Sequence, residues 1–159
     1  MKRLFVVVFV LLSMSLNSRA QIHPHAIGLR FGSNGNVSGA EISYQQGLSR
    51  VNRIEIDLGF GGNKDYSHLV FTGIYHWAWN ITEGLNWYVG PGAGIGFYSY
   101  DDYEDYINFA IGGQIGLEYD FNSLGAPILL SLDTRPMWDF LGENAGFGWG
   151  MALGVRYIW

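Results

Sequence analysis

Large apolar residues occupy every second position along much of this chain. The C-terminal segment shows the pattern most clearly, and its alternating large residues are Phe147, Trp149, Met151, Leu153, Val155, Tyr157 and Trp159. The residues between them are glycine, alanine, arginine and isoleucine. A period of two is typical of a β-strand with two unlike faces. We therefore predict that residues 147–159 form a strand with one apolar face.

Seven further segments show the same alternation, separated by clusters of turn-forming residues. Their ranges are 27–32, 40–45, 53–60, 69–79, 87–98, 107–119 and 128–135. The segment 69–79 is the least regular, because Val70 and Ile74 blur its alternation. In the segment 87–98, Pro91 lacks the N–H that a sheet ladder uses, so we expect a β-bulge there. The whole pattern indicates an all-β protein.

The eight apolar faces carry more large side chains than a small barrel can enclose. A soluble barrel would have to hold roughly forty of them, whereas eight strands surround an interior just wide enough for the side chains of one face. We therefore predict lipid-facing apolar surfaces and an all-β, eight-stranded antiparallel up-and-down transmembrane β-barrel. The alternative is a soluble lipocalin-like carrier of an apolar ligand, which would place Trp77, Trp79 and Trp87 inside.

Charged residues fall only on the opposite, inward faces of the predicted strands. They are Arg30, Arg53, Arg135 and Arg156 among the cations, and Glu41, Glu55, Asp57, Glu118 and Asp133 among the anions. Buried charges must be paired, so we predict a structural charge cluster that fills the lumen and leaves no open channel. We expect Asp133 to pair with Arg135 or Arg156.

The N-terminus has the features of a secretory signal peptide. Lys2 and Arg3 precede the apolar run Leu4–Leu12, and small residues stand at positions 18 and 20. We predict a signal peptide over residues 1–20, cleaved before Gln21, and a β-barrel domain over 21–159. The run is shorter than the ~20 residues that a membrane-anchor helix needs. The chain contains no cysteine, which excludes disulfides and a cysteine-linked lipid anchor.

The charge of the predicted mature chain excludes nucleic-acid binding. The full chain has 9 Lys+Arg and 14 Asp+Glu, for a net charge of −5. Removal of Lys2, Arg3 and Arg19 with the signal leaves 6 basic against 14 acidic residues, a net charge of −8. A protein this acidic lacks the basic surface that nucleic acids require.

Aromatic residues gather at both ends of the predicted strands, as in the girdles of outer-membrane barrels. The chain resembles the small eight-stranded outer-membrane barrels of the OmpA/OmpX type, on the segments 89–97 and 130–136 and the terminal Trp159. The resemblance implies a bacterial outer-membrane location with both termini periplasmic, and contact with outer-membrane lipid and lipopolysaccharide. It also implies that Trp159 is an assembly signal read by the barrel-assembly machinery, although phenylalanine is usual there.

Candidate catalytic and metal-binding residues are few, and we predict no catalytic residue, metal site or cofactor. His23 and His25 are too few to complete a metal site and are expected to lie in a flexible segment. Ser67 and His68, with Asp65, could form the triad of an outer-leaflet lipid-modifying enzyme, but neighbours on one loop rarely do so. The acidic run Asp101–Asp105 is expected to be a solvated loop, with weak divalent-cation binding as the alternative.

These observations favour a structural or accessory function. The predicted outer loops are short, the longest being Met137–Gly146, so they offer little surface for a receptor-like site. We predict an integral outer-membrane protein without enzyme activity, with lateral docking to a larger outer-membrane complex as one form of its role.

Overall fold

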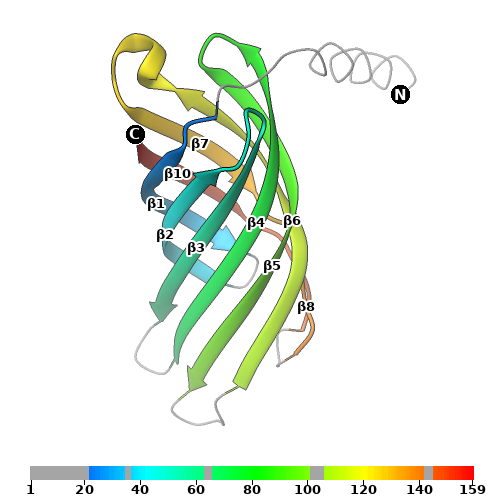
Figure 1. Ribbon diagram of the computed structural model, residues 1–159. Coiled ribbons are helices and arrows are strands. Elements are labelled where there is room, and N and C mark those ends of the chain that lie inside the picture. Colours follow the sequence, from blue (N-terminus) through cyan, green and yellow to red (C-terminus); the bar gives the residue numbers. More distant parts are fainter. Residues whose placement is uncertain (1–21, 35–36, 63–65, 101–105, 142–144) are drawn as a thin grey trace, which may run out of the picture.

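The computed structural model describes residues 22–34, 37–62, 66–100, 106–141 and 145–159 (Figure 1). The predicted signal peptide and the acidic run Asp101–Asp105 lie outside these residues. The elements are β1 (His25–Asn34), β2 (Val37–Gly47), β3 (Asn52–Gly62), β4 (Tyr66–Thr82), β5 (Leu85–Tyr100), β6 (Tyr106–Asp120), the 3₁₀ helix η1 (Phe121–Leu124), β7 (Ile128–Thr134), β8 (Met137–Asp139), β9 (Gly146–Gly148) and β10 (Met151–Ile158). Among the described residues, no helix is long and apolar enough to cross a membrane.

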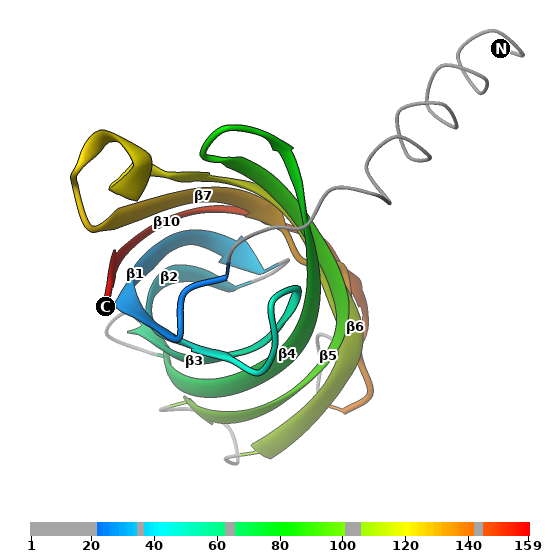
Figure 2. The ribbon, with the colours of Figure 1, turned by 45° about the horizontal axis from the view of Figure 1, so that its top comes forward.

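The strands form one closed antiparallel barrel (Figure 2). From β1 to β6 each strand pairs with the next one along the chain. Strand β6 then pairs with both β7 and β8, β7 pairs with β10, β8 pairs with β9, and β1 pairs with β10 to join the two ends of the chain. The seventh wall consists of β7 and β8 on either side of Arg135 and Pro136. The eighth wall consists of β9 and β10 on either side of Trp149 and Gly150. The barrel therefore has eight walls, which confirms the predicted all-β, eight-stranded up-and-down architecture.

Apolar side chains cover the outside of the barrel and polar side chains fill its inside. Along β10, exposed and buried residues alternate strictly over Met151–Ile158. On β7, Leu132 is 49% exposed whereas its neighbour Asp133 is 2% exposed. This arrangement is the reverse of a soluble apolar-core barrel, so the lipocalin-like alternative is wrong.

Two details of the wall differ from the expectations. Ile74 does not interrupt the alternation of β4, because it faces inward and is 1% exposed. The residue that faces outward beside it is Gly73, which made the pattern hard to read in the sequence. Around Pro91, the β4–β5 ladder omits two pairs between Ile74↔Gly92 and Trp77↔Val89 and then resumes without a shift. The strand therefore loses pairing at the proline and does not gain a bulged residue.

The wall of the barrel is longer on the side of β4, β5 and β6 than on the side of β1 and β2. Both chain ends of the described barrel lie at the end that carries the turns of β2–β3, β4–β5 and β6–β7 (Figure 1). At the opposite end, β4, β5 and β6 extend beyond the β1–β2 hairpin (Figure 1). Outward apolar side chains of β5 run from Trp87 to Phe97, but those described on β1 run only from Ile27 to Phe31. At about 3.3 Å per residue, these runs are about 33 Å and about 13 Å long along the strand.

Candidate functional site

The predicted lumen charges all point into the barrel and lie against one another. Each is 9% exposed or less, and they are Arg30, Glu41, Arg53, Glu55, Asp57, Glu118, Asp133, Arg135 and Arg156. We call these nine residues the lumen charge cluster. They come from six walls of the barrel, so strand register alone brings them together.

Arg135 lies at the centre of the lumen charge cluster. Its guanidinium lies 3.2 Å from Glu55 and 3.4 Å from Glu41, and it also pairs with Asp57. Its Nη2 donates a hydrogen bond of 3.0 Å to Gln114. One buried guanidinium therefore neutralises carboxylates of both β2 and β3.

Arg30 forms the second centre of the cluster, and it corrects the expected partner of Asp133. Arg30 lies 2.5 Å from both Glu41 and Asp133, and the Tyr88 hydroxyl donates a bond of 3.1 Å to Asp133. The pairing of Asp133 with Arg135 or Arg156 was therefore wrong. Between Arg30 and β7 stands β10, whose residue opposite Arg30 is Gly154. With no side chain in the way, the guanidinium reaches across β10 to the next wall.

Arg156 occupies the space that Gly154 leaves open. Arg156 donates to the hydroxyls of Ser43 at 2.9 Å and Ser131 at 2.7 Å, and pairs with Glu55 at 3.0 Å. A Cβ on Gly154 would lie 2.4 Å from the Ser131 hydroxyl and 2.6 Å from an Arg156 nitrogen. The Ser131 and Arg156 side chains pack so close to the backbone at position 154 that only glycine fits there.

Arg53 and Glu118 form a separate pair toward the end that carries the chain termini. Their side chains lie 2.7 Å apart. The Arg53 guanidinium also lies 4.7 Å from the centre of the Tyr88 ring, in cation–π contact. His76 accepts from Arg53 at 3.3 Å and packs against the same ring. Charged and aromatic groups together close this part of the lumen.

Sequence reasoning missed the neutral members of the lumen network. Gln45 and Gln114 donate hydrogen bonds to Glu55 at 2.5 and 3.2 Å. Tyr88 bridges the Arg30 and Arg53 groups, as described above. Their signal was present, because each occupies the inward parity of its strand, but a search for charges alone does not include amides and phenols.

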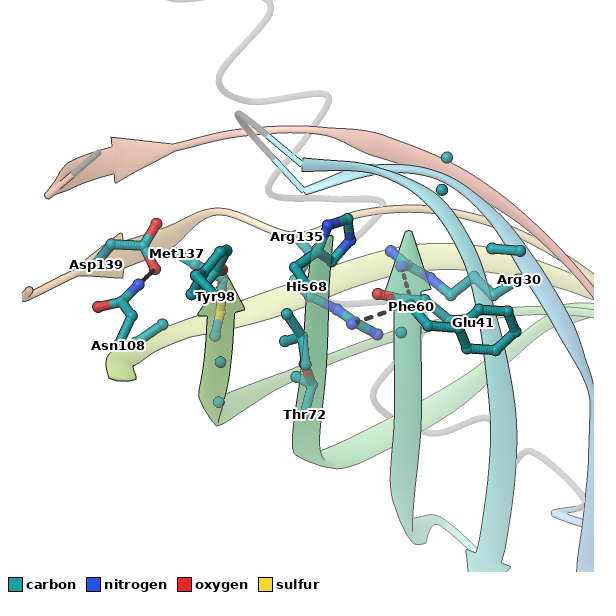
Figure 3. Close-up of a pocket in the computed structure, with 18 of the residues that line it drawn as sticks. Arg30, Glu41, Phe60, His68, Thr72, Tyr98, Asn108, Arg135, Met137 and Asp139 are labelled. Carbon is teal, nitrogen blue, oxygen red and sulfur yellow. Dashed lines mark hydrogen bonds and ion pairs between the residues drawn. The ribbon is translucent and has the colours of Figure 1, made fainter. Parts of the chain in front are cut away.

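A cavity adjoins the lumen charge cluster on the side away from the chain termini, and Figure 3 shows residues that line it. It has a volume of about 70 Å³, and Arg30, Glu41 and Arg135 line its inner end. We call this cavity the vestibule. A buried water occupies about 10–15 Å³ of such a cavity. The vestibule therefore has room for several waters or for part of a small ligand.

The structure separates the residues of the predicted enzyme alternative. His68 is 8% exposed and faces the vestibule, whereas Ser67 is exposed on the other face of β4. Asp65 lies outside the described residues. Adjacent residues of a strand point to opposite faces, so Ser67 and His68 do not form a catalytic pair.

The histidines after the predicted cleavage site pack against the barrel, in contrast to the expected flexible segment. His23 lies 2.6 Å from Asp120, and His25 lies 3.0 Å from the Tyr44 hydroxyl. The His25 ring also stacks on Trp159, with ring centres 5.3 Å apart. Within the described ranges, no group of three or more His, Cys, Asp or Glu side chains could hold a metal ion.

Comparison with known proteins gives matches by structure. No protein-family model matches the chain, and no curated protein sequence matches it. The Neisserial surface protein A superimposes with a TM-score of 0.60 at 13% identity, over 85% of this chain and 95% of that chain. The N-terminal β-barrel domain of OprF from Pseudomonas aeruginosa gives 0.55 at 17%, over 85% and 98%.

A third solved structure has the same architecture. The attachment invasion locus protein Ail of Yersinia pestis superimposes with a TM-score of 0.53 at 12% identity, over 85% of this chain and 96% of that chain. Identities this low establish a common fold and leave the activity open. The chain has the fold of the small eight-stranded outer-membrane β-barrels of the OmpA/OmpX type.

Proposed function

We propose that this chain is an integral bacterial outer-membrane protein with a structural or accessory role and both termini in the periplasm. The observation that carries the proposal is the combination of an apolar outer surface with a lumen closed by paired charges. A barrel of this kind is held in lipid and lipopolysaccharide by its outside and conducts nothing through its inside. In this role Trp159 is the signal for the barrel-assembly machinery.

Lateral docking to a larger outer-membrane complex is the finer part of this proposal. The β8–β9 hairpin supports it, because Trp138, Phe147 and Trp149 are 54%, 64% and 66% exposed. Trp138 and Phe147 stand opposite each other in the ladder. Aromatic side chains gathered in this way are enriched at protein interfaces.

The closed lumen predicts that the purified protein does not conduct ions. Reconstituted in a planar bilayer, it should show no large stable conductance, because the lumen charge cluster and Tyr88 cross the whole lumen. The matched control is a variant that carries both Arg135→Ala and Arg30→Ala and is shown to be folded by gel mobility. A steady porin-like current from the unaltered protein would contradict the closed lumen and the structural role that rests on it.

The proposed topology predicts which loop is accessible from outside the cell. Strand β5 ends and β6 begins at the end of the barrel opposite the chain termini (Figure 1). The acidic run Asp101–Asp105 is the sequence between these two strands. An epitope inserted there should be labelled on intact cells, whereas one inserted at Glu83–Gly84, in the turn between β4 and β5, should be labelled only after permeabilisation. The mature N-terminus should be Gln21 by mass spectrometry. Labelling in the reverse order would contradict the orientation.

A further inference from the structure

The first and last walls of the barrel meet in the ladder between β1 and β10, which we call the seam (Figure 2). Every other ladder joins walls that follow one another along the chain. Among the described residues, the seam is also the shortest ladder between neighbouring walls, running from Ala26↔Ile158 to Gly32↔Ala152. Pairing strands so distant in sequence costs more loop-closure entropy than forming a hairpin. We therefore expect the seam to form last and to open first.

Arg30 crosses the seam from β1 toward β7. The residue opposite Arg30 in the seam is Gly154, and the guanidinium passes this position to lie 2.5 Å from Asp133 on β7. The same guanidinium lies 2.5 Å from Glu41 on β2. Arg30 therefore ties β1 and β2, on one side of the seam, to β7 on the other side.

Arg156 crosses the same seam in the opposite direction. The residue opposite Arg156 is Gly28, and the residue of β2 opposite Gly28 is Ser43. Arg156 donates a hydrogen bond of 2.9 Å to the Ser43 hydroxyl and pairs at 3.0 Å with Glu55 on β3. It also donates a bond of 2.7 Å to the hydroxyl of Ser131 on β7. Arg156 therefore ties β10 and β7 to β2 and β3 across β1.

The two crossings are reciprocal, because each places an arginine of one strand opposite a glycine of the other. We call Gly28, Arg30, Gly154 and Arg156 the seam lock. A Cβ on Gly28 would lie 1.9 Å from the Val155 carbonyl oxygen and 2.6 Å from the Arg156 Cα. Any side chain at position 28 would therefore push the two backbones of the seam apart. Glycine at both positions lets the strands approach closely and lets the arginines lie across them.

We propose that the seam lock holds the barrel closed against lateral opening between β1 and β10. Opening breaks the backbone hydrogen bonds of the seam, and the freed N–H and C=O groups find no other partner in lipid. It also separates Arg30 from Asp133, and Arg156 from Glu55, which leaves buried charges without their partners. The lock thereby keeps the edges of β1 and β10 from pairing with a strand of another protein. This property does not depend on docking to a larger complex.

Hydrogen exchange of backbone amides, measured on the full barrel in detergent micelles, tests the lock. In Arg30→Met and in Arg156→Met, exchange in the seam should accelerate by about tenfold or more relative to exchange in the β4–β5 ladder. Arg53→Met is the matched control. Arg53 is as buried as the other two and pairs with Glu118, but this ion pair joins β3 to β6 and does not cross the seam. Its loss should change exchange in the two ladders by the same factor, to within about twofold.

A disulfide across the seam provides a second measurement. Leu29 and Val155 stand opposite each other in the seam and face outward, so cysteines at these positions leave the lock untouched. The chain has no other cysteine. The disulfide between Leu29→Cys and Val155→Cys should abolish the excess seam exchange of Arg30→Met, and reduction should restore it. If Arg30→Met does not assemble alone, the oxidised form supplies folded protein, and exchange is compared before and after reduction.

Heat-modifiable gel mobility must show that each protein is folded at the start of the measurement. Equal acceleration in the seam and in the β4–β5 ladder of both lock variants would overturn the proposal, because the arginines would then stabilise the barrel as a whole. The same conclusion would follow if Arg53→Met loosened the seam as much as Arg30→Met. Excess seam exchange that persists with the disulfide formed would also overturn it.

Discussion

Replacing Arg135 with methionine should lower the free energy of unfolding by about 3–5 kcal/mol, the usual effect of removing one partner from a buried ion pair. The variant leaves the carboxylates of Glu55 and Asp57 inside the lumen with fewer cations to balance them. Methionine keeps much of the side-chain length, so the loss reports charge more than volume. Urea unfolding of the barrel in lipid vesicles, followed by heat-modifiable gel mobility, measures the change.

Two further variants make this prediction specific to the lumen charge cluster. Arg50→Met removes an arginine from the exposed turn after β2 and should change stability by less than about 0.5 kcal/mol. Combining Arg135→Met with Asp57→Asn should recover part of the lost stability, because one unbalanced carboxylate is removed. If Arg135→Met were as mild as Arg50→Met, the cluster would not be a structural element of the barrel.

Placing an arginine on the outer surface at Leu132 should destabilise the barrel by roughly 2–4 kcal/mol and impair its assembly, if this position lies near the bilayer midplane. Leu132 is 49% exposed, and its partners in the ladder are Leu117 and Leu153. An arginine there would face acyl chains without an ion partner. Leu132→Ala should be milder, because lipid fills the space that a packed protein core would leave empty.

The neighbouring position provides the comparison for Leu132. Asp133→Ala acts inside the barrel, where it leaves Arg30 with Glu41 alone and removes the acceptor of the Tyr88 hydroxyl. We expect Asp133→Ala to destabilise more than Leu132→Ala, measured by the same urea unfolding in vesicles. A soluble barrel would give the opposite order, with Leu132→Ala severe and Asp133→Ala nearly silent.

The strand pattern predicted the architecture because a period of two assigns a face to every residue. Leu132 and Asp133 needed only their parity to be placed outside and inside. Strand 69–79 was harder to interpret because an inward isoleucine, Ile74, stands beside an outward glycine, Gly73. Apolar character therefore failed there as a sign of the outer face.

The partners inside the lumen could not be predicted from the pattern. Arg30 and Asp133 are 103 residues apart in the chain, and their contact depends on strand register and on the missing side chain of Gly154. The β5–β6 register likewise places Tyr98 opposite Tyr106, a residue outside the predicted strand 107–119.

The unequal apolar runs on the two sides of the barrel have a consequence for the surrounding bilayer. On strands tilted by about 35–45°, the run along β5 covers about 25 Å of depth, which is the usual height of the apolar band, whereas the run along β1 covers only about 10 Å. A hydrophobic surface that is too short is accommodated by local thinning of the bilayer or by tilting of the protein, at a cost of fractions of a kcal/mol per Å of mismatch. Lipids beside the β1–β2 hairpin should therefore be compressed relative to those beside β5. The barrel should accordingly favour one tilt direction in the membrane. In that direction the shorter side, formed by β1 and β2, tilts toward the headgroups.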